Sequence, residues 1–224
     1  MIPNQEIKEK IGEYTLDSVL GSKSILKVDT NKYVFYNRSQ YSSADAIKKM
    51  SKFSLGKNIL VGTDWILEEY VSFDNHKPSL YNMILLLKEI HKEKNLLGQS
   101  LVHGDFSSLN ITIYNNLTYV YDNEHVHWDN IYVDLGRVLL RECNNGKDIF
   151  DVFNIYFQNI PSTKILREGL MVFCDWQHII RKEKNRPYVD IPLLRKKKIL
   201  DSRDDLDSII NAFKLIDYPN KSFL

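Results

Sequence analysis

Residues 101–123 read LVHGDFSSLNITIYNNLTYVYDN and combine two acids and an amide with two short apolar runs. The runs cover residues 111–114 and 118–121, and both are rich in β-branched and aromatic side chains. They flank an Asn-Asn pair, a pattern that predicts two strands of a β-hairpin joined by a tight turn. The two acids and the amide then lie at the ends of strands.

Asp105, Asn110 and Asp122 are these three polar residues. A magnesium-dependent transfer of a phosphoryl group to a hydroxyl needs one base and two hard oxygen ligands for the cation. Three oxygen-bearing side chains at one edge of a hairpin could supply all three. We therefore expect Asp105, Asn110 and Asp122 to form one site.

Composition sets broad limits on this 224-residue chain. Its 43% hydrophobic residues can build a substantial core, and a formal net charge of +1 gives no reason to expect a nucleic acid as partner. Cys143 and Cys174 lack the spacing of a disulfide framework or a zinc site. No apolar run has the length of a membrane span and no signal-peptide core is present. We expect a cytoplasmic protein.

The N-terminal part of the sequence predicts a small antiparallel sheet with one inserted helix. The predicted strands cover residues 14–20, 24–29, 33–38, 59–62 and 65–71. Ser42 and Ser43 can cap a helix over residues 44–53. We expect an N-terminal nucleotide-binding lobe over residues 1–71.

The remainder, residues 72–224, is predicted to form a mainly helical lobe that carries the hairpin. Helical spacing of apolar residues predicts helices over residues 79–93, 132–142, 148–159, 163–184 and 201–215. The basic run at residues 195–198 precedes an acidic segment, which favours a solvated helix face over a phosphate or nucleic-acid site. The fold class is α+β.

Several stretches resemble the aminoglycoside phosphotransferase and choline kinase families, which share a bilobal protein-kinase-like fold. Residues 102–110, VHGDFSSLN, resemble their HGD-x4-N catalytic loop, and residues 120–140, VYDNEHVHWDNIYVDLGRVLL, resemble their IDWE…YDLA stretch. Residues 65–71, WILEEYV, look like the hinge, and residues 85–92, LLLKEIHK, look like the helix before the loop. The resemblance covers roughly residues 14–140.

The resemblance implies a role for each matching residue. Asp105 resembles the catalytic base that accepts the proton of the substrate hydroxyl, and Asn110 and Asp122 resemble the Mg²⁺ ligands. His103 could be a second base, although a bracing hydrogen bond is the favoured interpretation. ATP or GTP would be the phosphoryl donor, and Glu69 and Tyr70 at the hinge would contact it.

The predicted third strand departs from this family pattern. Kinase-like folds carry there a Lys that pairs with nucleotide phosphates and with a Glu on the next helix. Tyr36 occupies that position, and the helix offers only Asp45. Arg38, which shares a strand face with Tyr36, or Lys27 on the neighbouring strand could replace the missing cation.

The loop that would cover the phosphates, residues 21–24, has a single glycine. Its Ser and Lys donors, Lys23 among them, could still contact the nucleotide. Gly104 stands where protein kinases usually place an Arg that pairs with a phosphorylated loop, and this favours an unregulated small-molecule kinase.

Four further residues have more than one interpretation. Glu124 assists at the metal or is a solvated turn acid, and Asp134 has a structural role implied by the YDLA match. His125 and His127 alternate around Val126, but without a third ligand we interpret them as exposed loop histidines rather than a metal site.

Three functions are consistent with the sequence. The first is a nucleotide- and Mg²⁺-dependent phosphotransferase that acts on a hydroxyl of a small molecule or of a glycan sugar. The second is a pseudokinase or nucleotide-binding scaffold, which Tyr36 and the glycine-poor loop motivate. The third is a compact protein kinase or ATPase. The acceptor and the oligomeric state stay open at this point.

Overall fold

The chain, for which a computed structural model describes residues 4–20, 22–57, 60–73 and 76–215, divides into two compact units. The first unit is Met1–Asp129 and the second is Asn130–Leu224. The lobe boundary expected after residue 71 lies inside the first unit and stays a prediction.

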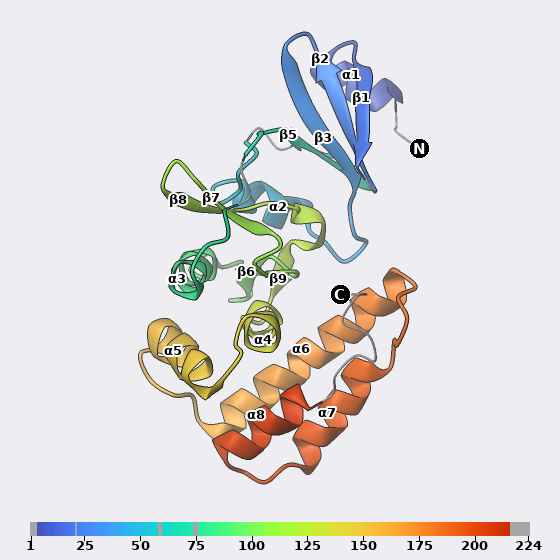
Figure 1. Ribbon diagram of the computed structural model, residues 1–224. Helices are drawn as coiled ribbons and strands as arrows, with labels where there is room; N and C mark the ends of the chain where they lie inside the picture. Colours follow the sequence, from blue (N-terminus) through green and yellow to red (C-terminus); the bar gives the residue numbers. More distant parts are fainter. Residues whose placement is uncertain (1–3, 21, 58–59, 74–75, 216–224) are drawn as a thin grey trace. The chain divides into compact units, whose positions relative to one another are not determined.

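The first unit begins with a five-stranded antiparallel sheet (Figure 1), as the strand pattern predicted. In spatial order its strands are β1 (Thr15–Leu20), β2 (Lys23–Val28), β3 (Asn31–Asn37), β5 (Trp65–Glu69) and β4 (Leu60–Val61). Gly21, in the predicted phosphate loop, and Ile59, in a predicted strand, lie outside the described residues.

A helix that the sequence analysis missed, α1 (Asn4–Ile11), covers one face of this sheet. Its Ile7 is fully buried in a cluster with Leu26, Phe35, Trp65 and Leu67. The Trp65 indole N–H donates to the Glu6 carboxylate at 2.9 Å. Because this short helix carries few apolar residues, its periodicity is weak, and its stability comes from packing on the sheet.

Two capped helices separate the strands of the first unit. The first, α2 (Ala44–Met50), begins where the Ser43 hydroxyl accepts from the Ala46 N–H, and the second, α3 (Leu80–Ile90), begins with a similar cap at Ser79. Both helices match the predicted positions and end a few residues earlier than expected. A side-chain cap satisfies one of the N–H groups that has no partner in the first turn.

The predicted hairpin is present as β7 (Ile111–Tyr114) and β8 (Leu117–Val120). Asn115 and Asn116 have φ angles of 48° and 62°, the left-handed values that a type I′ turn requires. A second pair, β6 (Ser100–Val102) with β9 (His127–Asp129), was not predicted because both strands have only three residues.

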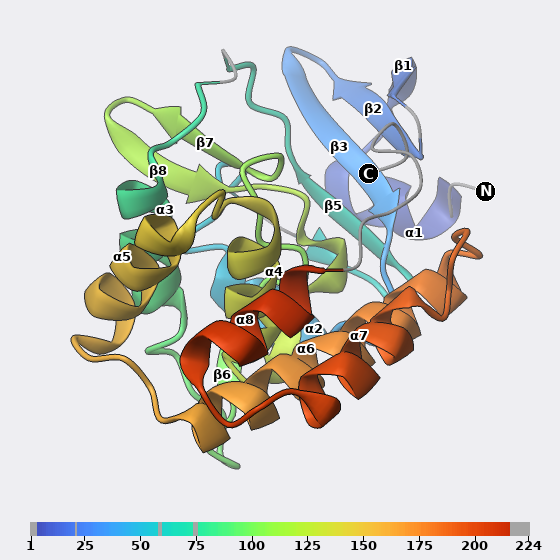
Figure 2. The same cartoon turned by 60° about the horizontal axis from the view of Figure 1, so that its bottom comes forward.

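The second unit is helical, as predicted (Figure 2). Its helices are α4 (Tyr132–Arg141), α5 (Gly146–Phe157), α6 (Thr163–Glu183), α7 (Ile191–Asp201) and α8 (Leu206–Lys214). In the described part of the chain, no helix combines the length and apolar character needed to cross a bilayer.

The prediction for the basic run needs a correction. Residues 195–198 lie in α7, a helix whose bounds the sequence analysis did not predict, and Arg195 is only 1% exposed. Its Nε donates to the Phe213 carbonyl at 2.7 Å, so α7 packs on α8 through a buried guanidinium. Lys196 pairs with Asp175 of α6 at 2.6 Å. Only Lys197 and Lys198 form the solvated face that we expected.

Helices α4 and α6 cross closely at two glycines. A Cβ atom on Gly136 of α4 would lie 2.4 Å from the Phe173 ring, and one on Gly169 of α6 would lie 2.2 Å from the Tyr132 ring. Each glycine therefore accepts the aromatic residue that stands four positions from the other glycine. This reciprocal arrangement sets the distance between the two helix axes.

We predict that Gly169→Ala lowers the free energy of unfolding by about 1–3 kcal/mol, the usual cost of overpacking. In a helix where nothing packs against the glycine, the same change would raise the free energy of unfolding by about 0.5–1 kcal/mol. The sign of the measured change therefore shows whether the two helices cross closely at this position. Denaturant unfolding measures the difference, with Glu168→Ala on the exposed neighbouring position as control. A stabilised Gly169→Ala variant would contradict the close crossing.

Candidate active site

The loop between β6 and β7 holds Asp105 and Asn110 together. The Asn110 side-chain Nδ2 donates to the Asp105 carbonyl at 2.9 Å and to the Asp105 carboxylate Oδ2 at 3.1 Å. An amide that uses its nitrogen on Asp105 directs its oxygen away from it. The loop thus presents one carboxylate and one amide oxygen, five residues apart, from a single fixed conformation.

His103 and Gly104 fix the start of this loop. The His103 ring is fully buried, and its Nε2 lies 3.0 Å from the Tyr121 carbonyl, to which it donates. Gly104 has φ +80°, and a Cβ there would lie 2.6 Å from the His125 carbonyl oxygen. A larger residue, including Arg, has no room at position 104. The contact of His103 with the segment before Asp122 is the bracing geometry that we favoured.

Asp122 follows β8, and the residue before it, Tyr121, donates its backbone N–H to the Asn110 carbonyl at 3.0 Å. Its backbone is left-handed, with φ 66° and ψ 62°, a conformation uncommon for residues other than glycine. Its Oδ2 pairs with the Lys23 Nζ at 2.8 Å. Its Oδ1 is buried and has no hydrogen-bond partner among the described residues.

The cation beside Asp122 comes from β2. The β2–β3 register pairs Ser24 with Phe35, and one further step places Lys23 beside Tyr36. The Lys23 Nζ lies 5.0 Å from the centroid of the Tyr36 ring. The position where the third strand lacks a Lys therefore receives an ammonium group from the neighbouring strand.

The two other predicted cations lie elsewhere. Lys27 is exposed and pairs across the sheet with Lys32 and Thr15, four residues along β2 from Lys23. Arg38 follows β3, and its Nε is buried without a partner among the described residues. Of the predicted cations, the structure brings only Lys23 to Asp122.

The sequence analysis missed two buried residues next to the Lys23–Asp122 ion pair, Glu68 of β5 and Asn123. The Asn123 Nδ2 donates to the Glu68 Oε2 at 2.9 Å, and the Asn123 backbone N–H donates to the Tyr36 hydroxyl at 3.1 Å. Glu68 is 6% exposed and Asn123 is fully buried. An acid within the apolar run of residues 65–68 is a signal that could have identified Glu68, because an acid is rarely buried without a partner.

Burial dominates the electrostatics of this cluster. It raises the pKa of Glu68 from its usual 4.5 to about 7, although hydrogen bonds from Asn123 and Tyr36 and the charge of Lys23 oppose the rise. Burial also raises the pKa of the Tyr36 phenol well above its usual value. Tyr36 therefore stays protonated at neutral pH and can donate a hydrogen bond to Glu68.

The predicted hinge residues lie in a separate place. Glu69 ends β5 and Tyr70 follows it, with the Tyr70 N–H donating to the Lys32 carbonyl at 2.9 Å. Both line a surface hollow of about 610 Å³ with Ser72 and the turn between β2 and β3. Neither Lys23 nor Asp122 lines this hollow.

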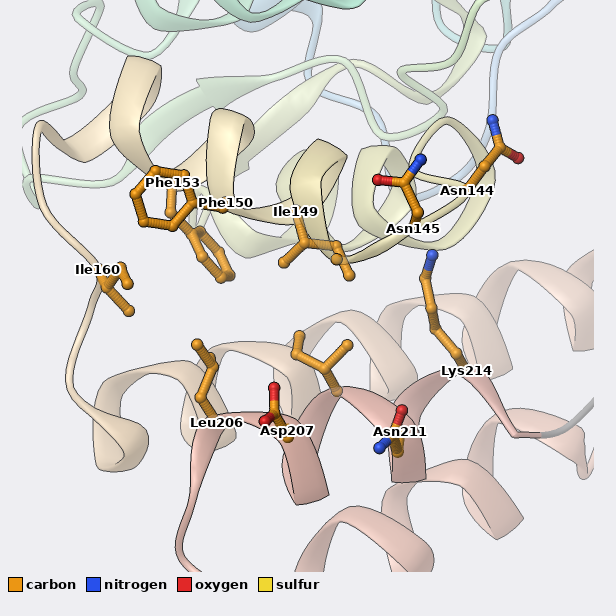
Figure 3. Close-up of a pocket in the computed structure, with 12 residues that line it drawn as sticks. Asn144, Asn145, Ile149, Phe150, Phe153, Ile160, Leu206, Asp207, Asn211 and Lys214 are labelled. Carbon is orange, nitrogen blue, oxygen red and sulfur yellow. The ribbon is translucent and has the colours of Figure 1, made fainter.

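A second hollow, in the helical unit, contains none of the predicted site residues. It measures about 390 Å³ and lies between α5 and α8. Figure 3 shows apolar side chains along most of its length and Lys214 directed from α8 toward Asn145. The Lys214 Nζ already donates to the Cys143 carbonyl.

The prediction that His125 and His127 are exposed is wrong. They are 2% and 7% exposed, because β9 pairs with β6 and brings this segment inside. The His127 Nδ1 donates to the His125 carbonyl at 2.7 Å. The His125 Nε2 lies 3.3 Å from the carboxylate of Glu124, which is only partly exposed; a role of Glu124 at a metal stays a prediction.

Asp134 lies in the first turn of α4 and is fully buried. Its expected structural role stays a prediction.

Asn110 and Asp122 fit a magnesium ion. Magnesium prefers oxygen ligands and is usually held by one or two side chains together with phosphate oxygens and water. Asp122 offers a buried Oδ1 without a partner in the described chain, and Asn110 offers an amide oxygen. Within residues 4–20, 22–57, 60–73 and 76–215, no three His, Cys, Asp or Glu side chains group as a metal site.

No protein-family model matches the sequence, and no curated protein matches it. The structure resembles choline kinase LicA from Streptococcus pneumoniae, with a TM-score of 0.50 and 13% identity over 93% of this chain and 95% of that one. It also resembles an aminoglycoside phosphotransferase from Alicyclobacillus acidocaldarius, with a TM-score of 0.50 and 10% identity over 91% and 90%.

The chain has the fold of choline kinases and aminoglycoside phosphotransferases. This confirms the α+β, protein-kinase-like fold that the sequence motifs predicted. Within this fold, β3 is the strand that usually carries the phosphate-binding Lys. The position of Tyr36 on β3 and of Lys23 on β2 is thus a departure from the usual arrangement.

We predict that Glu68 gives the protein a pH-dependent stability between pH 4.5 and 7. Because the folded protein holds a proton that the unfolded chain releases, the contribution of Glu68 is fully present below pH 4.5 and is lost as the pH rises to about 7. Unfolding free energies of the wild type and of Glu68→Gln, measured across this range, should differ in slope. Parallel curves would contradict the raised pKa.

Proposed function

We propose that this protein is a phosphotransferase that uses ATP or GTP and Mg²⁺ to phosphorylate a hydroxyl of a small molecule or a glycan sugar. The observation that carries the proposal is a chain of contacts: the Asn110 amide holds Asp105, the backbone N–H of Tyr121, next to Asp122, donates to the Asn110 carbonyl at 3.0 Å, and Lys23 pairs with Asp122. The names of the two similar structures, a choline kinase and an aminoglycoside phosphotransferase, support a small acceptor.

Asp105 is the proposed base. Its carboxylate is held by the Asn110 amide, which fixes the direction in which it can accept the proton of an acceptor hydroxyl. Phosphoryl transfer passes through a loose transition state, so positioning and charge neutralisation matter more than covalent assistance. The His103 Nε2 donates to the Tyr121 carbonyl, so we propose that His103 braces the loop and assign it no proton-transfer role at that atom.

Asn110 and Asp122 are the proposed metal ligands. When bound, Mg²⁺ would neutralise charge on the transferred phosphate and on the donor nucleotide. Lys23 would bind the phosphates of the nucleotide, as the Lys of the third strand does elsewhere in this fold. The unpaired, buried Nε of Arg38 supports it as a second candidate for an anion contact. Glu69 and Tyr70 are proposed to contact the nucleotide base.

The scaffold alternative was motivated by Tyr36 in place of a Lys. The Lys23 ammonium, 2.8 Å from Asp122, weighs against this alternative because it offers a cation from another strand. Gly104, which has no room for an Arg, supports a small-molecule kinase over a regulated protein kinase.

We predict that Asp105→Asn reduces phosphoryl transfer by at least about 100-fold, the usual contribution of a general base, while the fold is kept. The assay first measures phosphate release from ATP and GTP with Mg²⁺ and with EDTA, and then transfer to a panel of hydroxyl acceptors. Asp64→Asn, an exposed loop acid, is the control. Near-normal turnover in Asp105→Asn would exclude the assignment, and a folded wild type without nucleotide turnover would favour the scaffold.

We predict that Lys23→Met raises the KM for the nucleotide by about 10-fold to 100-fold, since a charge-assisted contact with phosphate contributes about 1.5–3 kcal/mol. Lys27→Met, on the same strand and the same face, is the matched comparison. Initial-rate kinetics at saturating Mg²⁺ separate the two variants. A larger loss in Lys27→Met than in Lys23→Met would transfer the phosphate-binding role to Lys27.

A further inference from the structure

Asn123, the residue after Asp122, is bound by a closed ring of hydrogen bonds. Its backbone N–H donates to the Tyr36 hydroxyl, and its side-chain Nδ2 donates to the Glu68 carboxylate. The Tyr36 hydroxyl in turn donates to Glu68, which closes the ring. All three side chains are at least nine-tenths buried, so water cannot replace these bonds without opening the core.

A third hydrogen bond completes the attachment of Asn123. The Ser54 hydroxyl donates to the Asn123 Oδ1 at 3.2 Å, so both polar atoms of the amide are bonded. The partners come from β3, from β5 and from the segment after α2. Asn123 is therefore fixed to three separate elements of the first unit. Asp122, one residue earlier, must keep its left-handed backbone to satisfy them.

Tyr36 also contacts the cation of the site. The Lys23 Nζ lies over its ring at 5.0 Å from the centroid, a distance at which an aromatic face attracts an ammonium group. The same Nζ pairs with the Asp122 Oδ2. One tyrosine therefore contacts Lys23 through its ring and Asn123 through its hydroxyl.

A carboxylate as deeply buried as Glu68 is costly to the fold. Burial without an ion pair at close range disfavours its charged form, and an apolar side chain would avoid this cost. Glu68 is placed to accept hydrogen bonds from both Asn123 and Tyr36. A functional reason for this cost is that the two hydrogen bonds hold Asn123, the residue next to the proposed metal ligand Asp122.

We propose that Tyr36, Glu68 and Asn123 are positioning residues that hold the Asp122 carboxylate and the Lys23 ammonium in the site. They would replace the pair of a third-strand Lys and a helix Glu that this fold normally uses. This inference rests on the proposed phosphotransferase function. In this protein, Tyr36 organises the metal ligand through its hydroxyl and the phosphate-binding cation through its ring.

The test uses variants that separate the two contacts of Tyr36. Tyr36→Phe keeps the ring under Lys23 and removes the hydroxyl bond to Asn123. Glu68→Leu removes the acceptor for both donors, whereas Glu68→Gln keeps an acceptor oxygen and serves as the conservative rescue. Tyr14→Phe removes a tyrosine hydroxyl that lies against the apolar cluster of the sheet and is the control. Circular dichroism checks the folding of each variant.

The primary measurement is Mg²⁺ binding in the presence of a non-hydrolysable ATP analogue. Isothermal titration calorimetry gives the dissociation constant for each variant. Loss of a residue that orients a metal ligand typically weakens metal binding by about 10-fold to 100-fold. We expect such a loss in Tyr36→Phe and Glu68→Leu, and little change in Glu68→Gln and Tyr14→Phe. The KM for the nucleotide at saturating Mg²⁺ should change little in Tyr36→Phe, because the ring under Lys23 is kept.

Amide hydrogen exchange of residues 122–126, measured together with Mg²⁺ binding, distinguishes a positioning role of Tyr36 from a purely structural one. Faster exchange in Tyr36→Phe together with weaker Mg²⁺ binding supports the proposal. Faster exchange with unchanged Mg²⁺ binding would overturn it, because the ring of bonds would then serve stability alone. Unchanged exchange and unchanged binding would overturn it as well. A folded wild type that binds no Mg²⁺ and nucleotide would overturn the proposed function and this inference with it.

Discussion

The ion pair between Lys23 and Asp122 is the contact on which the candidate site depends. It joins the second strand of the sheet to the residue after the hairpin, over almost one hundred positions of sequence. Both side chains are partly exposed, so the pair is open to ligands and contributes little to stability by itself. Its importance is geometric, because it places a cation beside a carboxylate that also has an unpaired buried oxygen.

The residues next to this ion pair carry two features that lower the stability of the fold, namely buried polar groups and a left-handed backbone. Glu68 and Asn123 are buried polar groups that are tolerated only because each donor has an acceptor. Asp122 keeps a left-handed backbone, which is uncommon for residues other than glycine. Strain and buried polarity gathered at one position are typical of functional sites, since a core selected only for stability would avoid both.

Local sequence patterns predicted the regular elements well where periodicity was strong. The hairpin at residues 111–120 and helix α6 agree closely with expectation, because alternation, turn residues and apolar spacing are local properties. The short elements were not predicted, because their stability does not depend on local sequence patterns. Helix α1 and the three-residue strands β6 and β9 are stabilised by partners distant in sequence, and no window of their own residues carries that information.

The sequence by itself determined that Asp105, Asn110 and Asp122 flank the strands of one hairpin, and that a Lys is missing from β3 at Tyr36. It could not determine which cation lies beside Tyr36. The β2–β3 register places Lys23 there rather than Lys27, since a strand pairing of distant residues fixes which side chains face each other. Burial of Glu68, His125 and Arg195 was likewise decided only by tertiary structure, because burial depends on what packs over a residue rather than on its type.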